Sequence, residues 1–554
     1  MHISFQDVVF AFLGGLGLFL FGLRFMSGAL HDVAGDKMRR MLEYGTKNPI
    51  RGVLTGALAT ALIQSSSATT VITVGLVNAQ LLTLRQAIGI IMGANIGTTI
   101  TAYLIGLNLQ DYSLPILGIG ALIYIFSRDK KAQLIGQAIL GFGLLFFGLS
   151  LMGEGMKPLK DLPLFINLMS NIENHSILGV VVGTLFTFIV QSSSATIGVL
   201  QELAFQKAVT YYQAIPILLG DNIGTTVTAL LAALGASVAA RRAALTHFMF
   251  NVIGTCIFLP LFLLGVFDKM VILITDTLFS LGSGGWDTLN IKLQIAQTHA
   301  IFNISNMIIH LPFVGVLAFI VTKLIPDSSS QEMDDFRPKF INKRFLDNSS
   351  VALAQAVRES MRMGELARQA FYTAIEYFNT RDQSLIPKAM QMENTINMLE
   401  REITDYLVLV SQRPLSQEDS NTAYTTLQSL NDIERIGDLC EAIMKQADYA
   451  TAHNVSFSGE AQEELSRMIE LTEETLIVAM QALQKQDVSL AKRVEQNDML
   501  INHMQAEYRR AHIRRLNEHI CNGNNGAVFL DLLGNLERIS AHCRRITGYI
   551  LSVN

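Results

Sequence analysis

A series of long apolar runs fills the sequence up to about residue 325 and constrains the fold more than any other feature. Each run reaches or approaches the ~20 residues that a helix needs to cross a bilayer. Lipid cannot hydrogen-bond to backbone amides and carbonyls, so we expect these runs to be helical. The candidate spans cover residues 8–30, 52–84, 86–110, 112–127, 132–152, 176–201, 212–238, 243–267 and 293–322. The sequence predicts an all-α, polytopic membrane domain at residues 1–325.

The composition changes at Asp327, where charge-rich stretches with the spacing of amphipathic helices begin. We therefore predict a linker at residues 326–347 and a soluble helical domain at residues 348–554. Lysine and arginine in the linker favour a cytoplasmic exit from the last span, which places the tail in the cytosol. The net charge of -5 argues against nucleic acid as a partner.

An internal repeat relates two parts of the membrane domain, at about residues 50–152 and 177–267. The segment QSSSAT occurs at 64–69 and again at 191–196, and NIGTT recurs at the same offset of 127 residues, at 95–99 and 222–226. Basic residues fall in different loops of the two copies, at 128–131 in the first and 241–242 in the second. If basic loops are cytoplasmic, the two copies are inverted with respect to one another.

The same reasoning makes residues 52–84 leave and re-enter the membrane on one side, as a re-entrant hairpin broken at QSSS. Two such hairpins of opposite direction are typical of secondary transporters built from inverted repeats. The basic residues place the C-terminal domain inside and the N-terminus outside a bacterial cytoplasmic membrane.

The hairpins contain no charged residue from Gly52 to Leu84 or from Ser176 to Gln201. Serine hydroxyls and free amides at a half-helix N-terminus are donors that suit an oxyanion such as phosphate. Packing of small polar residues is the alternative interpretation, and the duplication favours function. The predicted phosphate-binding residues are Ser65, Ser66, Ser67, Ser192, Ser193 and Ser194.

Amide, hydroxyl and carbonyl oxygens near the hairpin tips form a hard-oxygen set that suits sodium. A divalent anion in a core without arginine or lysine would carry uncompensated charge, which co-bound cations could neutralise. The predicted sodium-binding residues are Gln64, Thr69, Asn95, Thr98, Thr99, Gln191, Thr196, Asn222, Thr225 and Thr226.

A smaller duplication, THxxFN, brings His247 and Asn251, and again His299 and Asn303, into membrane spans. These residues are either gating or ion-linked contacts, or neutral side chains that tie helices together. Asp221 stands beside the second NIGTT, where the first copy has Ala94. It either biases ion binding in one copy or caps a helix.

These motifs resemble the type II sodium/phosphate cotransporters, a family whose hallmark is a QSSS hairpin in each of two inverted halves. Both QSSSAT motifs, both NIGTT segments and RRAALTHFMFN from Arg241 stand in the family's order. The resemblance covers roughly residues 1–325 and implies phosphate at the two serine triplets, with sodium near Gln64 and Gln191. The family is not catalytic.

The tail from about residue 348 resembles PhoU-type helical domains, which are linked to phosphate regulation in bacteria. Residues 427–443 are echoed 103 positions later at 530–546, which predicts two similar helical bundles. The PhoU pattern E-x-x-x-D, one helical turn long, survives at Glu434 and Asp438, whereas Ala541 replaces the acid in the second copy. These carboxylates either bind a metal or form salt bridges.

We therefore predict sodium-coupled transport of inorganic phosphate, with a regulatory tail. The alternatives are a phosphate exporter, a carrier of another oxyanion, and a membrane-tethered phosphate sensor. No residues are arranged for covalent or acid–base chemistry, which argues against an enzyme, and we expect no cofactor besides the coupling ion. The expected partners are phosphate, sodium and lipid, and the helical tail suits a homodimer or cytosolic regulatory proteins.

Overall fold

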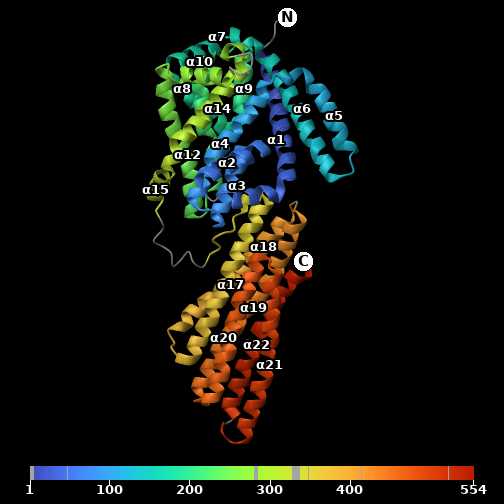
Figure 1. Cartoon of the computed structure of the whole chain (residues 1–554), viewed down its shortest axis with the longest axis vertical. Helices are drawn as coiled ribbons and strands as arrows, with labels where there is room; N and C mark the ends of the chain where they lie inside the picture. The colour runs from blue at the N-terminus through green and yellow to red at the C-terminus, as the bar shows by residue number, and fades with distance from the viewer. Residues whose placement is uncertain are drawn as a thin grey trace. The chain divides into compact units, whose positions relative to one another are not determined.

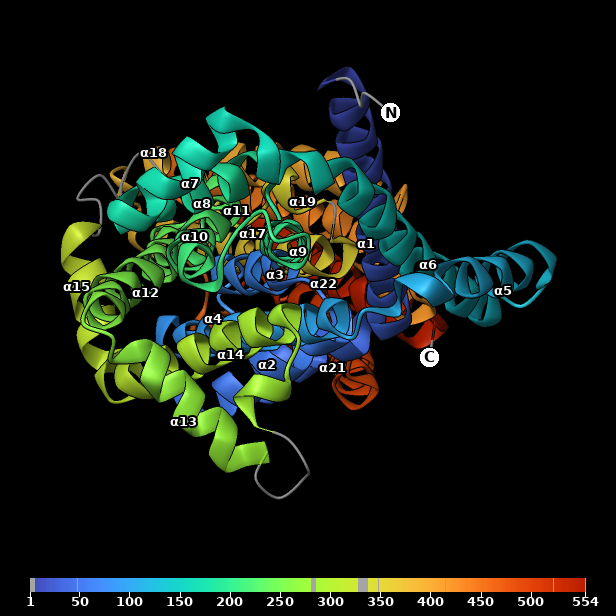
Figure 2. The same ribbon diagram turned by 90° about the horizontal axis from the view of Figure 1, so that it is seen from above.

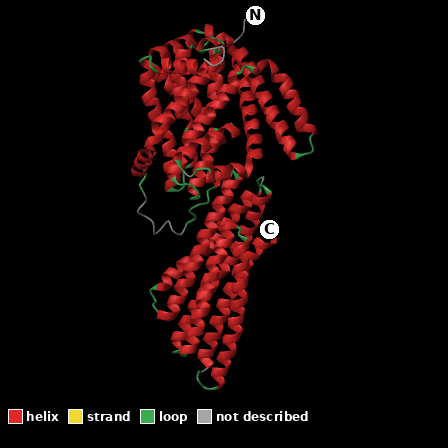
Figure 3. Ribbon diagram, viewed as in Figure 1, coloured by secondary structure: helices red, strands yellow, loops and turns green. Residues whose placement is uncertain are grey.

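The computed structural model describes residues 5–46, 48–279, 285–326, 337–346, 348–413, 415–521 and 523–553. These residues form helices and connecting loops and contain no strand (Figure 3), which confirms the all-α prediction. The chain divides into two compact units, Met1–Asp327 and Ser328–Asn554 (Figure 1).

Most helices of the first unit are apolar. Seven helical stretches of the described residues are long and apolar enough to cross a membrane, and one bent helix pair could add an eighth span. The helices are α1 (Phe5–Tyr44), α2 (Pro49–Ile63), α3 (Ser66–Asn78), α4 (Leu84–Gly106), η1 (Leu109–Tyr112), α5 (Ser113–Phe126), α6 (Lys130–Met156), η2 (Lys157–Asp161), α7 (Pro163–Asn174), α8 (Ser176–Val190), α9 (Ser193–Phe205), α10 (Tyr211–Thr225), α11 (Val227–Ala232), α12 (Val238–Leu263), α13 (Phe267–Phe279), η3 (Trp286–Thr288), α14 (Ile291–His310), η4 (Leu311–Phe313) and α15 (Val314–Leu324).

Two of the predicted spans are divided helices. Residues 52–84 contain α2 and α3, and residues 176–201 contain α8 and most of α9, because the backbone leaves the helical conformation at Gln64 and at Gln191. The sequence did not predict α7, which precedes α8 at a bend of 117°, as a separate helix.

The segment α2–α3, called hairpin 1, doubles back on itself. Glycines in α4 pack against the backbone of α2 in parallel register, with Gly89 beside Gly52 and Gly97 beside Ala57. The chain can reach the start of α4 from the end of α2 only by returning along α3. A doubled-back segment is therefore built into the first copy, as the sequence predicted.

The segment α8–α9, called hairpin 2, repeats this geometry against α10. Gly220 lies against the Val180 carbonyl and Gly224 against the Thr184 carbonyl, again in parallel register. A Cβ at either glycine would overlap backbone atoms of α8, so the absence of a side chain permits this close approach.

The two hairpins lie at different levels of the first unit. Figure 1 shows α2 and α3 in its lower half and α8 and α9 in its upper half. Seen from above, α3 and α9 both lie near the middle of the unit, whereas α5 and the part of α6 beside it project to one side (Figure 2).

Each hairpin also contacts the other copy. α3 packs against α11 and α12, and α9 packs against α4 and α14. At the end of α3, the Asn78 side chain accepts a hydrogen bond of 2.8 Å from the Ser237 amide, across 159 residues of sequence. The two copies thus form one interlocked core.

The second unit is a pair of three-helix bundles. Helices α17, α18 and α19 pack together, α20, α21 and α22 form a similar group, and α19 joins the two groups by packing against α22. The bounds are α17 (Ser349–Thr380), α18 (Leu385–Ser411), α19 (Gln417–Ala452), α20 (Gly459–Lys485), α21 (Val488–Asn517) and α22 (Gly523–Val553).

The predicted linker, residues 326–347, lies partly outside the described residues, at 327–336 and 347. Its described part is fastened to the second unit. The buried Glu359 carboxylate of α17 accepts hydrogen bonds from the Lys339 amide at 2.8 Å and the Phe340 amide at 2.6 Å. This segment, including the short helix η5 (Lys343–Phe345), therefore packs with the helical tail.

Candidate functional site

The tips of the two hairpins have the same local structure. Gln64 ends α2 at φ 60° and Gln191 ends α8 at φ 56°, both in the left-handed region. The following serine is extended in each case and caps the next helix: Ser65 Oγ accepts from the Ala68 amide, and Ser192 Oγ from the Ala195 amide, both at 3.2 Å. QSSS is therefore a helix stop followed by a capped helix start.

Each tip presents donors in a confined space. The first amides of α3 and α9 have no carbonyl one turn before them, because each helix starts there. Ser66 begins α3, and Ser193 and Ser194 begin α9; all three are buried. Ser65, Ser67 and Ser192 are partly exposed. Hydroxyls and free amides thus gather at the N-terminal end of a helix, where the helix dipole also favours an anion.

A pair of threonines links the two helices of each hairpin. The hydroxyls of Thr60 and Thr69 lie 3.0 Å apart in hairpin 1, and those of Thr187 and Thr196 lie 2.7 Å apart in hairpin 2. Thr69 also donates to its own helix cap, the Ser65 carbonyl, at 3.1 Å. The hydroxyl bond therefore holds the second helix of the hairpin to the first, directly behind the tip.

The two predicted glutamines differ in their surroundings. Gln64 is buried, and its Oε1 accepts a hydrogen bond of 2.9 Å from the Thr101 hydroxyl of α4. Gln191 is exposed, and Thr228, the counterpart of Thr101, donates to the Thr225 carbonyl instead. The structure thus brings the first glutamine against the helix that carries NIGTT and leaves the second open.

The NIGTT segments point their donors at their own helices. Asn95 and Asn222 donate to the carbonyls four residues earlier, at 2.9 and 3.0 Å. Thr98, Thr99, Thr225 and Thr226 likewise donate to nearby carbonyls. Each hydroxyl proton and one amide proton of each asparagine are therefore used, while oxygen lone pairs remain to accept. Such a set suits a cation better than an anion.

The structure does not bring the two THxxFN segments together. α12 and α14 cross in antiparallel register, with Gly254 against Asn306 and Phe258 against Phe302. From the helical rise, His247 and His299 lie about 20 Å apart along this pair. Each is buried, and Asn251 and Asn303 each donate to the carbonyl of the histidine in the same segment.

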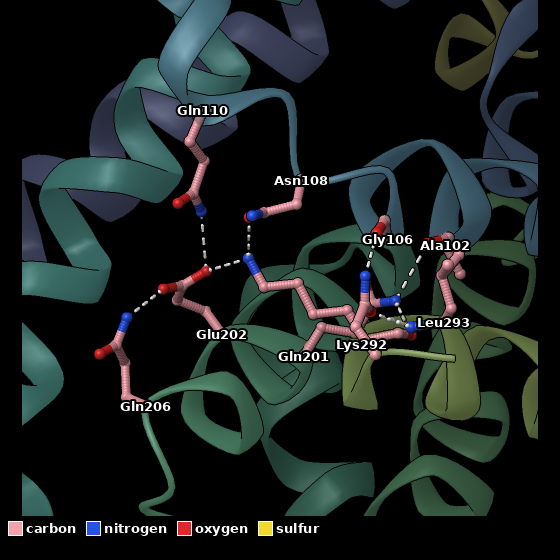
Figure 4. Close-up of polar contacts among 10 residues, drawn as sticks. Ala102, Gly106, Asn108, Gln110, Gln201, Glu202, Gln206, Lys292 and Leu293 are labelled. Atoms are coloured by element: carbon pink, nitrogen blue, oxygen red, sulfur yellow. Dashed lines mark hydrogen bonds and ion pairs between the residues drawn. The ribbon is translucent and has the colours of Figure 1, made fainter. Parts of the chain in front are cut away.

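A buried ion pair is the feature that sequence reasoning missed (Figure 4). Lys292 at the start of α14 and Glu202 near the end of α9 are fully buried, with Nζ and Oε2 2.7 Å apart. Gln110 donates to Glu202 Oε2 at 2.9 Å, Gln206 donates to Oε1 at 2.7 Å, and Lys292 donates to the Asn108 side chain at 3.2 Å.

This pair corrects the expectation of a core without lysine. Lys292 is buried in the first unit, but its charge is balanced by Glu202. The preceding residue adds a second tie, because the Gln201 side-chain amide donates to the carbonyls of Ala102 and Lys292. The far end of α9 is thus fastened to both α4 and α14. A single lysine outside any motif gives no sequence signal that its partner lies 90 residues away.

Comparisons with known families assign both units. The family model described as Na+/Pi-cotransporter matches residues 18–154 and 161–283, and a PhoU domain model matches residues 360–447 and 465–550. The first unit belongs to the Na+/Pi-cotransporter family. The tail of the chain carries PhoU domains. The resemblance predicted from QSSSAT and NIGTT is confirmed, and with its apolar helices this family member is a multi-pass membrane protein.

Several relatives extend the match. YjbB of Escherichia coli strain K12, a protein named for inorganic phosphate export, is 25% identical over 96% of this chain and 95% of its own length. The human sodium-dependent phosphate transport protein 2B is 43% identical over 97 residues, which are 17% of this chain and 14% of that protein. A crystal structure of PhoU from Pseudomonas aeruginosa matches 36% of this chain and 97% of its own, at 22% identity and a TM-score of 0.34.

The acidic pair of the PhoU tail contacts a basic residue. Arg435 lies 3.5 Å from a Glu434 oxygen and 2.9 Å from an Asp438 oxygen. Partial burial, followed by the nearby Asp438 charge, raises the pKa of Glu434. Among the residues described, no three His, Cys, Asp or Glu side chains are placed to hold a metal ion together. This geometry favours the salt-bridge interpretation.

Proposed function

We propose that this member of the Na+/Pi-cotransporter family carries inorganic phosphate across the membrane together with sodium ions. The observation that carries the proposal is the pair of serine tips, which share one geometry at φ 60° and 56° in two copies of the same sequence. A tetrahedral oxyanion offers several acceptor oxygens to such donors, and Ser65–Ser67 and Ser192–Ser194 would provide them from two sides.

Sodium is proposed at the oxygens beside the tips. The NIGTT threonines and asparagines donate hydrogen bonds to their own helices, and their oxygens keep acceptor lone pairs for a hard cation. We assign Gln64, Thr69 and Asn95 with their counterparts Gln191, Thr196 and Asn222 to this role, together with Thr98, Thr99, Thr225 and Thr226.

A charge argument supports coupling. Lys292 is neutralised by Glu202, so it has no net charge to offer a bound phosphate. Moving a divalent anion through a low-dielectric core without a counter-charge is costly. Sodium ions that bind and move with phosphate would remove that cost.

The orientation and the surroundings form part of the same proposal. We place the two copies in inverted orientation in a bacterial cytoplasmic membrane, with the N-terminus outside and the PhoU tail in the cytosol. The tail would regulate transport and provide a surface for a second copy or for cytosolic proteins. His247, His299, Asn251 and Asn303 would act as gating contacts.

Outward transport is a second candidate. It is favoured by one observation, the match over 96% of the chain to a protein named for phosphate export. The same serine tips would serve either direction, because binding geometry does not fix net flux. Flux measured from each side under opposite sodium gradients distinguishes the two candidates.

The test is radiolabelled phosphate flux in proteoliposomes, with and without a sodium gradient, for the wild type and for Ser66→Ala and Ser193→Ala. Each substitution removes a hydrogen bond to a charged ligand, which is worth about 1.5–3 kcal/mol or roughly 10- to 100-fold in binding. Ser127→Ala, at an exposed helix cap away from both tips, is the matched control.

Sodium-driven flux that both tip substitutions abolish, and that the control retains, supports the proposal. Flux that is indifferent to sodium removes the coupling, and competition by sulfate or arsenate tests the choice of oxyanion. A protein that binds phosphate but moves none would be a sensor instead.

A further inference from the structure

Asp221 is a buried acid that the phosphate and sodium sites proposed above do not use. It lies on α10, with a solvent-exposed fraction of 0%. Its Oδ1 accepts a hydrogen bond of 2.7 Å from the Thr187 hydroxyl, whereas Oδ2 has no hydrogen-bond partner among the described residues. An isolated buried carboxylate is costly, so in such a position it requires a counter-charge or a proton.

The carboxylate is connected to the tip of hairpin 2 by two hydroxyls. The Oγ atoms of Thr187 and Thr196 lie 2.7 Å apart, and Thr196 Oγ lies 3.2 Å from the Ser192 carbonyl oxygen, so the single hydroxyl proton of Thr196 serves either Thr187 or that carbonyl. Ser192 is the residue that caps α9 at the tip. A change of charge at Asp221 therefore acts on the serine tip through a chain of three contacts, Asp221–Thr187, Thr187–Thr196 and Thr196–Ser192.

The first copy provides an internal comparison. Thr60 bonds Thr69, and Thr69 donates to the Ser65 carbonyl, just as in hairpin 2. The position of Asp221 is held by Ala94, which is buried on α4. The repeat thus folds with the same hydroxyl chain and no acid, so the acid is not needed for that local structure.

No neighbouring helix supplies an obvious counter-charge. α8 and α11 contain no charged residue, Glu202 of α9 is paired with Lys292 of α14, and no ion pair among the described residues includes Asp221. The remaining charged or titratable residues of the helices packed against α10 are Glu173 on α7, Arg241, Arg242, His247 and Cys256 on α12, and His299 and His310 on α14.

Glu173, Arg242, His299 and His310 are held by contacts that do not include Asp221, and the ring of His310 packs on Phe250 and contacts the Asn306 carbonyl. Glu173 accepts a hydrogen bond from Gln213, two turns before Asp221, and Arg242 donates to the Ile325 carbonyl. Thr298, next to His299, bonds Tyr211 at the start of α10. The Asp221 carboxylate is therefore left to be neutralised by something that enters the core.

We propose that Asp221 binds a monovalent cation, a proton or a sodium ion, that moves with the transported anion. The second copy would then contain a charged cation site and the first copy only neutral oxygens. This inference rests on the proposed function, since it assigns an additional coupling ion to the same carrier. It makes the two copies of the repeat chemically unequal.

Binding is tested first, without transport, on the purified full-length protein. Asp221→Ala reproduces the residue of the first copy and is expected to fold, and Asp221→Asn keeps the volume. If the ion is sodium, exchanging potassium for sodium raises the melting temperature of the wild type more than that of either variant, because ligand binding stabilises the native state. If it is a proton, the wild type gains stability relative to the variants as the pH falls, in potassium alone.

Transport is tested second, by the membrane potential at which phosphate flux reverses in proteoliposomes. The variants are expected to move one positive charge fewer per phosphate than the wild type. They lose sensitivity to either the sodium gradient or the pH gradient, and the gradient that is lost identifies the ion. Glu173→Gln, an acid beside the other end of α10, is the matched control and should keep the wild-type ratio.

Variants with the same sodium-dependent and pH-dependent stability as the wild type would overturn the inference. If the wild type moved no phosphate, the proposed function would fail, while the melting measurements would still decide whether Asp221 binds a cation.

Discussion

Gln64 and Gln191 hold a backbone conformation that costs a residue with a Cβ roughly 1–2 kcal/mol. Glycine would avoid this cost, so the glutamine side chain is expected to have a use. In the first copy that use is visible, because the amide oxygen of Gln64 accepts from Thr101. In the second copy the side chain is exposed and free to meet a ligand.

Small residues are required where α2 meets α4 and where α8 meets α10. Gly93→Ala should destabilise the protein by about 1–3 kcal/mol or more, because its Cβ would overlap the Val53 carbonyl. Gly118→Ala on α5, where a Cβ meets nothing within 4 Å, should be neutral or stabilising. Melting temperatures in detergent compare the two, and equal shifts would contradict the packing argument.

Glu434 makes the stability of the PhoU tail depend on pH. Burial and Asp438 raise its pKa in the folded state, so this carboxyl favours folding at low pH and loses that contribution as the pH rises through its folded-state pKa. Glu434→Gln should therefore slow hydrogen exchange in α19 at neutral pH, with a difference from wild type that shrinks in acid. Exchange that is faster in the variant at neutral pH would mean that the Arg435 contact dominates.

At the scale of elements, the two ends of helix α9 make different contacts. Its first turn carries Ser193 and Ser194 at the tip, and its last turn carries Glu202, which is tied to Lys292. Three turns of helix separate the ends. A movement of the tie therefore moves the serine tip, whereas the end of the opposite hairpin is joined to the second copy by the neutral bond between Asn78 and Ser237.

Removing one partner of the Lys292–Glu202 ion pair should lower the stability of the protein. Lys292→Met leaves the Glu202 carboxylate buried without its cation and should destabilise the protein by about 3–5 kcal/mol. Adding Glu202→Gln removes the stranded charge and should recover much of this loss. Melting temperatures of the single and double variants measure the coupling, and a double variant no more stable than Lys292→Met would show that the charges are independent.

At the scale of the whole molecule, the chain forms two compact units. The first unit contains both hairpins, and the described end of the linker is fastened to the second by Glu359. The hydrogen bonds that form the two hairpin tips join residues of the first unit.

Removal of the tail should change regulation and leave transport intact. A chain that ends after residue 345 is expected to retain phosphate flux per inserted molecule, with an altered response to phosphate on the side of the tail. Flux assays on reconstituted full-length and truncated protein, normalised to protein in the vesicles, make the comparison. Complete loss of flux in a well-inserted truncation would assign the tail a direct part in transport.

The sequence by itself determined the local structure: the helix breaks at QSSS, the second half-helix that starts within each QSSS motif, and the helical tail. These features depend on residues a few positions apart, so capping and periodicity can be recognised in the sequence. The tertiary structure alone decided that Lys292 meets Glu202, that Gln64 is buried while Gln191 is exposed, and that His247 and His299 lie far apart. Those outcomes depend on which helices pack against one another and in which register. Residues that are distant in sequence carry no local signal that they will meet.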